Sequence, residues 1–305
     1  MSHPLVSVCV PTFNGEAYLA EALASIEAQD YPSAEAIISD DGSLDRTLAI
    51  AEDFAARTRF PCRIFRHQPD TLAGNWNFAA QAARGEYLKF LFQDDLLYPR
   101  HLAALVAAAE SAPSVNFVFA RRDVLFMPDA ARSEVARRMK ADCAELHRGF
   151  TRLRAFQRGE DLLADPRLLA AGWNKIGEPS AVLIRRSAFL ATGGFDPDFR
   201  QLIDLDLYLR LIPGGTVGFV DESLSAFRVH DAQLSVVQTN SGLGEREEAL
   251  FARKMTDSDL RRFFTASTLA QLAWSAAARP GRAPGGFRGR RLAVRAWVKR
   301  ALGFR

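Results

Sequence analysis

The sequence predicts an α/β protein with a mostly parallel β-sheet, helices on both faces of the sheet and a helical C-terminal extension. Short apolar runs alternate with amphipathic segments through the first 120 residues, as in consecutive strand–helix units. Polar residues, many of them acidic, follow these runs directly. The chain of 305 residues is 48% hydrophobic and 25% charged. It can therefore bury one large core or two smaller ones, and this composition excludes overall disorder.

The first strand–helix unit is the clearest. Residues 5–10 form a β-rich run that ends at Pro11, and apolar residues then recur at helical spacing over 18–26. Asn14 precedes this helical segment and is of a type that accepts hydrogen bonds from a first helical turn. We therefore predict Asn14 as the N-cap.

A second unit repeats this order. Residues 36–39 are strand-like, and the segment from Asp40 to Ser43 has the composition of a tight turn. We predict a helix over 44–57, capped by Ser43. The remaining elements predicted for this half are a strand at 62–66, a helix at 74–84, a strand at 87–92, a helix at 99–112 and a strand at 115–120.

The second half is less regular. Residues 121–172 are rich in arginine and helical in composition, and we interpret them as an insertion or as a subregion that faces an acceptor. A turn is predicted at 193–197. An amphipathic helix at 204–211 carries acids in its first turn, where they complement the helix dipole.

Polar side chains gather where three predicted strands end. They are Thr12, Asn14 and Glu16 after the first strand, Asp40 and Asp41 after the second, and Gln93, Asp94 and Asp95 after the fourth. The carboxyl ends of parallel strands meet at one edge, where open α/β sheets bind ligands. We therefore expect one crevice to collect all three groups. The plainer interpretation of the acidic pairs is that they form turns or cap helices.

Several short motifs occur in a fixed order along the chain. They include VSVCVPTFN at 6–14, IISDDGS at 37–43 and FLFQDD at 90–95, with further matches at 45–47, Asn77, 85–87, 194–196, 204–206, Arg210 and 228–230. Their ordered combination resembles glycosyltransferase family 2. The resemblance implies the GT-A fold and inverting transfer from a nucleotide-sugar. It divides the chain into a donor-binding half (1–120), an acceptor-binding half with the catalytic base (121–235) and a helical basic extension (236–305).

The resemblance assigns residues to the donor pocket. It implies that Pro11, Thr12, Asn14 and Glu16 line this pocket and that the Asp40 carboxylate accepts the imide N–H of uracil or thymine. Gln93, Asp94 and Asn77 are further candidate donor contacts. The alternative for Asn77, as for Asn75, is that it caps and packs the third predicted helix beside Trp76.

The resemblance also implies a divalent cation, Mg²⁺ or Mn²⁺, on the diphosphate of the donor. Asp94 matches the last acid of the family's Asp-x-Asp motif, and Asp95 and His230 are the other candidate ligands. Carboxylate oxygens suit these cations, and Mn²⁺ also accepts a neutral imidazole. Phe92 replaces the first acid of the motif, so its contact must come from Gln93, Asp95 or water. The plainer interpretation of His230 is a histidine at the surface or at the edge of the core.

Asp204 matches the acid that serves this family as general base. A carboxylate on the acceptor side suits single displacement, because it can take the proton from the attacking hydroxyl. Ile203 precedes it where the family often has glutamate, and Asp206 is the competing candidate. The alternative for Asp204 is an acid that stabilises the start of a helix.

The C-terminal residues differ in charge from the rest of the chain. Residues 279–305 carry nine Arg or Lys and no acid, whereas the whole chain has 39 basic and 36 acidic residues. Interleaved apolar residues make this tail a candidate for lying on an anionic membrane surface, and the alternative is a solvated end. No recognition motif supports a nucleic-acid partner.

The remaining features concern location. Cys9, Cys62 and Cys143 are too few and too scattered for a disulfide framework. No signal peptide or apolar span is evident. We therefore expect a cytoplasmic protein, with attachment to the inner face of the membrane as the alternative.

The predicted function is inverting transfer of a sugar from a UDP- or dTDP-sugar to a hydroxyl of a glycan or lipid-linked acceptor, in the synthesis of a bacterial surface polysaccharide. Two rivals are weighed. A sugar nucleotidyltransferase would need a Gly-rich basic loop after the first strand, which residues 11–15 do not provide. A non-catalytic relative that binds nucleotide-sugars is favoured only by Phe92.

Overall fold

The computed structural model describes residues 3–277 except 69, 113, 129–145, 170–173 and 234–242. Its N-terminal strands are β1 (Val6–Thr12), β2 (Ala34–Asp40), β3 (Cys62–Arg66) and β4 (Tyr87–Phe90). They pair in parallel in the order β3-β2-β1-β4, and the register places Thr12 opposite Asp40. The carboxyl ends of these four strands therefore share one edge of the sheet, as the sequence predicts.

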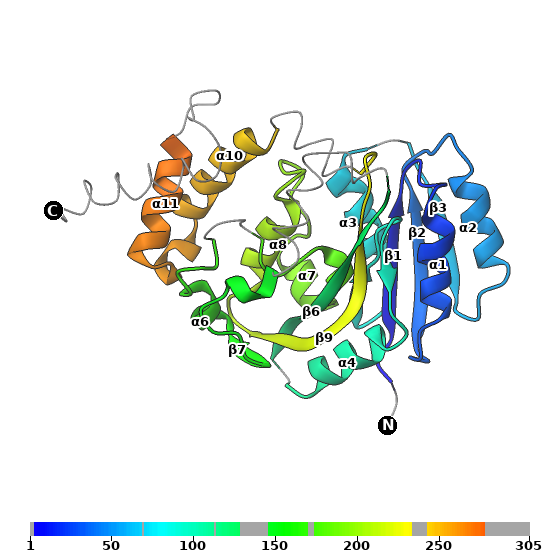
Figure 1. The fold of residues 1–305 in the computed structure, drawn as a ribbon, viewed down its shortest axis with the longest axis horizontal. Helices are drawn as coiled ribbons and strands as arrows, with labels where there is room; N and C mark the ends of the chain where they lie inside the picture. The colour runs from blue at the N-terminus through cyan, green and yellow to red at the C-terminus, as the bar shows by residue number, and fades with distance from the viewer. Residues whose placement is uncertain are drawn as a thin grey trace.

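Helices cover both faces of this parallel sheet (Figure 1). They are α1 (Leu19–Glu27), α2 (Thr47–Ala55), α3 (Leu72–Ala82) and α4 (His101–Glu110). Alternate residues of a strand point to opposite faces, so Val8 packs in one apolar cluster with Leu23 of α1, whereas Cys9 packs in the other with Trp76 of α3. The predicted α/β class with helices on both faces is confirmed.

Further strands, some antiparallel and some parallel to their neighbours, extend the sheet beyond β4. They are β5 (Leu96–Leu97), β6 (Val115–Phe126), β7 (Phe156–Arg158), β8 (Val182–Arg185) and β9 (Thr216–Val229). Within the described residues the full order is β3-β2-β1-β4-β8-β6-β9-β5, and β7 also pairs with β9. β8 lies antiparallel between β4 and β6, while β6 and β9 run parallel. This mixed half of the sheet brings the end of β9 back towards the loop after β4.

The prediction of a helical subregion over 121–172 is wrong in part. β6 continues to Phe126, because its backbone pairs with β9 along the whole length of that strand. The segment also contains a 3₁₀ turn, η2 (Leu146–Gly149), the strand β7 and only one short helix, α6 (Gly159–Leu163). Residues 129–145 and 170–173 lie outside the described residues.

The remaining elements are helical. They are η3 (Pro179–Ala181), α7 (Arg186–Ala191), α8 (Ile203–Leu211), α10 (Leu243–Asp257), η4 (Asp259–Phe263) and α11 (Ala266–Ala277). α10 and α11 lie at the end of the molecule far from β3 (Figure 1). The predicted helical C-terminal extension is confirmed over 243–277, and the basic tail lies outside the described residues. None of the helices in the described ranges has the length and apolar character needed to cross a bilayer.

Candidate active site

The loops that follow β1 and β2 are joined by reciprocal hydrogen bonds. Asn14 donates its backbone N–H to Ser43 Oγ (2.9 Å), and its Oδ1 accepts from the N–H of Leu44 (2.9 Å). Glu16 N–H donates to Asp45 Oδ2 (3.0 Å), and Glu16 Oε2 accepts from the N–H of Arg46 (3.0 Å). In this structure Asn14 and Glu16 therefore fix the shape of the edge at which the donor pocket is predicted.

The two predicted helix caps are corrected by this arrangement. Asn14 does not cap α1: it has a positive φ of 46°, and its side chain reaches the loop after β2. Ser43 does not cap α2, because its hydroxyl donates to Asp40 Oδ1 (2.5 Å). Local composition identified the right residue types, but partners on the neighbouring loop take their side chains.

Asp40 lies at the end of β2 and is almost fully buried, with 1% exposed. Its carboxylate accepts from Thr12 Oγ1 (3.1 Å), from Ser43 Oγ and from the Ser43 N–H (3.0 Å). Asp41 is more accessible and accepts from the N–H of Asp70 (2.8 Å), while His67 Nδ1 lies 3.3 Å from its carboxylate. Burial raises the pKa of Asp41. Asp40 thus builds the pocket wall, and Asp41 is the carboxylate nearer to solvent.

Gln93 connects the loop after β4 to the loop after β1. Its Oε1 accepts from the Phe13 N–H (2.9 Å), and its Nε2 donates to the Phe13 carbonyl (3.1 Å). The oxygen and the nitrogen of the Gln93 amide are thus both hydrogen-bonded to the Phe13 backbone, as the backbone of a neighbouring strand would be. Gln93 therefore joins two edges of the predicted donor pocket, and in this geometry it does not replace the missing acid of the Asp-x-Asp motif.

Phe92, which replaces the first acid of the Asp-x-Asp motif, has aromatic neighbours. Its ring centroid lies 4.4 Å from that of Trp76 in α3, and Trp76 meets Phe195 at 5.0 Å. A carboxylate at position 92 would face an aromatic cluster instead of a diphosphate. The departure from the family motif is thus coupled to a local apolar contact.

Asn77 and Asn75 lie inside α3, so neither caps it. Asn77 Nδ2 donates to the Phe195 carbonyl (2.8 Å), and its Oδ1 accepts from the Phe195 N–H (2.8 Å). Asn75 Nδ2 donates to the Thr12 carbonyl (3.3 Å). The predicted packing role is therefore visible for both asparagines, with Asn77 holding the turn at 193–197 against α3.

Asp94 and His230 meet across the sheet edge, at 3.2 Å between Asp94 Oδ2 and His230 Nε2. Arg228, in β9 two residues before His230, donates to the Asp94 carbonyl (2.8 Å) and to Glu21 Oε2 (2.7 Å). The ring of Tyr18 packs against both the Arg228 guanidinium and the His230 imidazole. These contacts explain the spacing of the Arg-Val-His motif at the end of β9.

Asp95 is fully buried beside this pair. Its Oδ1 accepts from the Arg228 N–H (3.1 Å), and its buried Oδ2 has no hydrogen-bond partner among the described residues. Burial and the charge of Asp94 hold the pKa of Asp95 well above its usual value. As a carboxyl placed behind Asp94, Asp95 would need the loop to open before it could reach a metal ion.

The candidate ligand side chains at this edge suit a divalent cation that also binds a substrate. In the described part of the chain no group of three or more His, Cys, Asp or Glu is arranged to hold a metal ion. Asp94 and His230 provide one carboxylate and one imidazole within contact distance. Mg²⁺ and Mn²⁺ commonly bind through one or two protein ligands together with substrate phosphates and water. The two side chains present are compatible with that mode of binding.

Asp204 is the second residue of α8 and is partly buried. Its Oδ2 accepts from Asn174 Nδ2 (2.7 Å), and its Oδ1 accepts from the Leu205 N–H (2.7 Å). Desolvation is the main cause that raises the pKa of Asp204 to about 7, and the negative charge of Glu178 adds to it. A carboxyl with this pKa can accept a proton near neutral pH.

Asp206, the competing candidate base, is fully buried in an ion-pair network. Its Oδ2 lies 2.5 Å from Arg210 Nη2, and its Oδ1 lies 2.6 Å from Lys254 Nζ. Arg210 also donates to the carbonyls of Thr192 and Gly194. Asp206 and Arg210 therefore join α8 to the 192–194 segment and to Lys254. Of the two acids, Asp204 is the better candidate for the base.

Glu178 is a further candidate site residue, and no sequence motif marks it. It makes a two-point ion pair with Arg122, at 2.7 Å to Nε and 2.9 Å to Nη2, and Arg122 lowers the pKa of Glu178. The charge of Glu178 acts on both Asp95 and Asp204. The same charge therefore influences both the edge with the predicted metal ligands and the predicted base. Its partner is 56 residues away in sequence, and no local pattern marks this pair.

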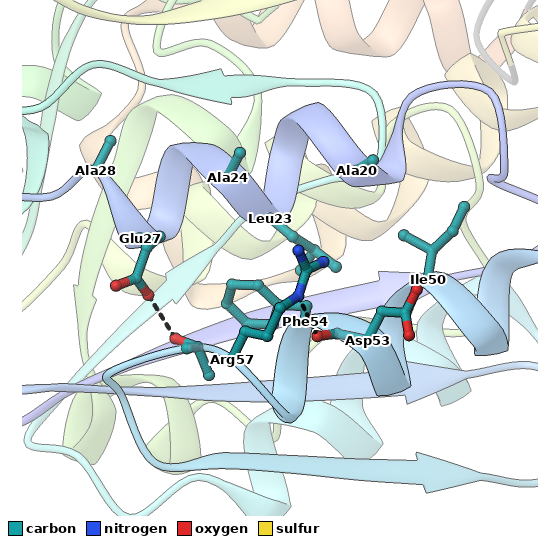
Figure 2. A pocket seen from close by; sticks show the side chains of 10 residues that line it. Ala20, Leu23, Ala24, Glu27, Ala28, Ile50, Asp53, Phe54 and Arg57 are labelled. Atoms are coloured by element: carbon teal, nitrogen blue, oxygen red, sulfur yellow. Dashed lines mark hydrogen bonds between the residues drawn. The ribbon is translucent and has the colours of Figure 1, made fainter.

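A separate groove of about 470 Å³ lies between α1 and α2 (Figure 2). It is lined mainly by apolar side chains, among them Leu23, Ile50 and Phe54, with Glu27 and Asp53 at its margin. None of the predicted site residues lines it. The groove therefore plays no part in the arrangement of acids described above.

Comparison with known proteins agrees with this architecture. The family description "Glycosyl transferase family 2" matches residues 7–175 of this chain. An uncharacterized protein of Mycobacterium tuberculosis is 36% identical over 226 residues, which cover 74% of this chain and 67% of that protein. An uncharacterized glycosyltransferase of Haemophilus influenzae is 26% identical over 235 residues, which cover 76% of this chain and 71% of that protein.

Two solved structures share the fold. TarS residues 1–349 of S. aureus in complex with UDP-GlcNAc has a TM-score of 0.64 at 18% identity, covering 88% of this chain and 70% of that one. The mannosyltransferase PcManGT from Pyrobaculum calidifontis, in complex with GDP-Man and Mn²⁺, has a TM-score of 0.62 at 18% identity, covering 100% of this chain and 82% of that one. The protein is a glycosyltransferase with the expected GT-A fold, and it belongs to glycosyltransferase family 2.

Proposed function

We propose that this glycosyltransferase transfers a sugar from a UDP- or dTDP-sugar to an acceptor hydroxyl with inversion at the anomeric carbon. The observation that carries the proposal is the Asp204 carboxyl, whose pKa is raised to about 7 at the start of α8. The charge of Glu178 acts on this carboxyl and also on Asp95, one of the acids that follow β4, so the same charge influences the predicted base and the predicted donor edge. UDP-GlcNAc bound to TarS supports a uridine nucleotide donor.

In the proposed reaction, Asp204 takes the proton of the acceptor hydroxyl while that oxygen forms a bond to the anomeric carbon. The bond between the anomeric carbon and the phosphate oxygen breaks, and the electron pair leaves with the nucleoside diphosphate. Because attack and departure occur on opposite faces, the configuration inverts. Asn174 orients the Asp204 carboxylate through its hydrogen bond of 2.7 Å.

The nucleotide is proposed to lie over the carboxyl ends of β1, β2 and β4. Pro11, Thr12, Asn14 and Glu16 shape this edge. Asp40 remains the proposed carboxylate for the base, and Asp41 is the more exposed of the two neighbouring acids. Asp94 and His230 would hold a divalent cation, with Asp95 as a ligand only after the loop opens. Such a cation supplies charge stabilisation to the leaving diphosphate. Mn²⁺ in the PcManGT structure supports this assignment.

The domain division and cellular role are part of the same proposal. Residues 1–120 would bind the donor, and 121–235 would bind the acceptor and supply the base. The acceptor would be a glycan or lipid-linked hydroxyl in the synthesis of a surface polysaccharide, at the inner face of the membrane. The packing of α8 on β6, where the rings of Tyr208 and Phe117 stack at 5.7 Å, supports this assignment of the acceptor half, and α8 lies far from β3 (Figure 1).

The test measures release of UDP or dTDP from a panel of nucleotide-sugars, chosen by the thermal shift that each gives. Asp204→Asn is expected to lower turnover by about 100-fold or more while UDP affinity, measured by calorimetry, stays within twofold. Turnover of the wild-type protein should rise with pH through about 7, as Asp204 loses its proton. Full activity in Asp204→Asn would remove the base assignment. Loss of both activity and UDP binding would point to a structural role.

A further inference from the structure

We propose that the C-terminal helix α10 positions Asp204, with Glu247 as the positioning residue and Lys254 as its partner. The inference rests on the proposed function of Asp204, because it assigns α10 to the same reaction. The residues that carry it belong to the extension after residue 236, which the sequence motifs do not reach. Figure 1 shows α10 beside α8.

Glu247 binds the backbone immediately before α8. Its Oε1 accepts from the Arg200 N–H (2.9 Å), and its Oε2 accepts from the N–H groups of Gln201 (2.8 Å) and Leu202 (3.0 Å). Three successive N–H groups thus converge on one carboxylate that is 4% exposed. Hydrogen bonds to an ionised acceptor in such a place are among the stronger ones in proteins. They fix the chain two residues before Asp204.

Lys254 provides a second attachment two turns later on α10. Its Nζ lies 2.6 Å from Asp206 Oδ1 and 2.5 Å from Asp196 Oδ2. Asp206 is in the first turn of α8, and Asp196 is in the turn held by Asn77. Lys254 therefore ties α10 to α8 and to the 193–197 turn together.

Apolar contacts complete the same face of α10. Phe251 and Met255 are fully buried, and the Phe251 ring lies 6.1 Å from that of Phe199. Positions 247, 251, 254 and 255 recur at i, i+4, i+7 and i+8, the spacing of a single helix face. One face of α10 thus contacts the segment 196–206 in three ways. Glu247 and Lys254 bind it through charged hydrogen bonds and ion pairs, and Phe251 packs against it between them.

The consequence is a fixed position for the catalytic carboxyl. Asp204 is held from one side by Asn174 Nδ2 and lies near the charge of Glu178 and the ring of Tyr208. Its backbone is held from the other side through the three N–H groups bound by Glu247. A displacement of about 1 Å in a reacting group can lower a rate about 100-fold, so this attachment is expected to act on turnover more than on donor binding.

The experiment compares Glu247→Gln with Asp257→Asn in the full chain. Asp257 is an exposed acid at the end of the same helix, so the control removes the same charge without touching α8. The readout is the titration of the Asp204 carboxyl by NMR in protein labelled with ¹³C at the aspartate carboxyl carbon. The resonance is assigned by its absence in Asp204→Asn, so this measurement needs no substrate.

In Glu247→Gln the Asp204 midpoint is expected to fall by about one pH unit, because a looser segment lets water reach the carboxyl. Asp257→Asn should titrate as the wild type does. With an active nucleotide-sugar, kcat of Glu247→Gln should fall about tenfold with the donor KM within twofold. An unchanged Asp204 midpoint in a folded Glu247→Gln protein would overturn the proposal.

If Glu247→Gln does not fold, Lys254→Met provides a test from the second attachment with kcat as its readout, because loss of the cation beside Asp206 itself acts to raise the pKa of Asp204. Its kcat should fall with the donor KM within twofold, and an unchanged kcat in a folded Lys254→Met protein would overturn the proposal. The outcome also separates the two proposals. A shifted midpoint together with full turnover in Asp204→Asn would retain the role of α10 in positioning Asp204 and reject Asp204 as the base. An unshifted midpoint with loss of turnover in Asp204→Asn would do the reverse.

Discussion

Asp204 and Asp206 lie two residues apart in α8, yet their surroundings give them different chemistry. Asp206 is enclosed by the cations of Arg210 and Lys254, which satisfy its charge. Asp204 has a neutral amide partner and the nearby negative charge of Glu178, so the pKa of Asp204 is raised. The sequence presents both as acids in a first helical turn. Arg210 lies one turn along the same helix as Asp206, but Lys254, Asn174 and Glu178 come from segments distant in sequence, and these partners distinguish the surroundings of the two acids.

The raised pKa of Asp204 predicts a pH-dependent contribution to stability. Its pKa of about 7 in the folded protein exceeds the ordinary 3.8, so the folded state binds this proton more tightly than the unfolded state. The stabilisation is fully present below pH 3.8 and is lost as the pH rises through about 7. Asp204→Asn removes this dependence. Its free energy of unfolding relative to the wild type should increase by about 2 kcal/mol between pH 4 and pH 8, after allowance for partial exposure.

Urea denaturation of both proteins at the two pH values measures this difference. The comparison between pH values cancels any constant cost of placing an amide beside Asn174. Equal differences in unfolding free energy at pH 4 and pH 8 would show that Asp204 titrates normally in the folded protein.

Phe92 gives a second prediction at this scale. Phe92→Asp restores the acid of the family motif but places it against Trp76, at a ring contact of 4.4 Å in the native protein. Partial burial of an unpaired carboxylate should lower the free energy of unfolding by about 2 kcal/mol or more, whereas Phe92→Leu should lower it by about 1 kcal/mol. Urea denaturation distinguishes them, and equal stability of the two variants would contradict the aromatic-contact explanation.

At the scale of elements, the loops after β1, β2 and β4 are joined to one another by hydrogen bonds. The β1 and β2 loops share four reciprocal hydrogen bonds, and Gln93 joins the β4 loop to the first of them. The edge that is predicted to hold the donor is thus formed before any ligand arrives. Preorganisation of this kind lowers the ordering cost of binding.

Gln93→Ala tests this coupling. Removal of the amide frees the Phe13 backbone from the β4 loop, and UDP affinity is expected to fall about three- to tenfold because the loops must be ordered on binding. Gln93→Glu keeps an acceptor for the Phe13 N–H but places a carboxylate against the Phe13 carbonyl, so it should not restore affinity. Calorimetry with UDP measures both. Wild-type affinity in Gln93→Ala would show that the link is dispensable.

The predictability of each element follows from where its partners lie. β1, β2 and β4 could be predicted because they are mostly apolar and buried along their length, the pattern of a parallel sheet covered on both faces, whereas β3 is only partly buried. β9 was missed because polar residues, Asp221 to Ser223, interrupt it at the point where its register with β6 shifts. β8 is only four residues long and lies antiparallel between two strands that are distant in sequence. Neither carries a local signal of its own.

For the whole molecule, the central prediction was that separated acidic segments meet at one region of the sheet. A chain of contacts supports it: Thr12 binds Asp40, Gln93 joins the loops after β1 and β4, and His230 reaches Asp94. The charge of Glu178 then reaches both Asp95 and Asp204. Motif order predicted which residues gather. The ion pairs of Arg122 with Glu178 and of α10 with α8 could not be predicted, because each joins residues that no local pattern relates.

The uneven distribution of charge over the chain predicts how the whole protein meets a membrane. Residues 279–305 carry nine of the 39 basic residues and no acid, so the preceding part has an excess of acids. An anionic surface should therefore attract the tail and repel the rest, which would orient the protein as well as bind it. Co-sedimentation with vesicles of 30% phosphatidylserine should retain the full chain at low salt. Removal of 280–305 should reduce the bound fraction severalfold, because each basic residue near such a surface contributes about 1 kcal/mol. Neutral phosphatidylcholine vesicles are the control, and raised ionic strength should release the full chain by screening. A bound fraction that survives truncation would assign membrane attachment to another surface.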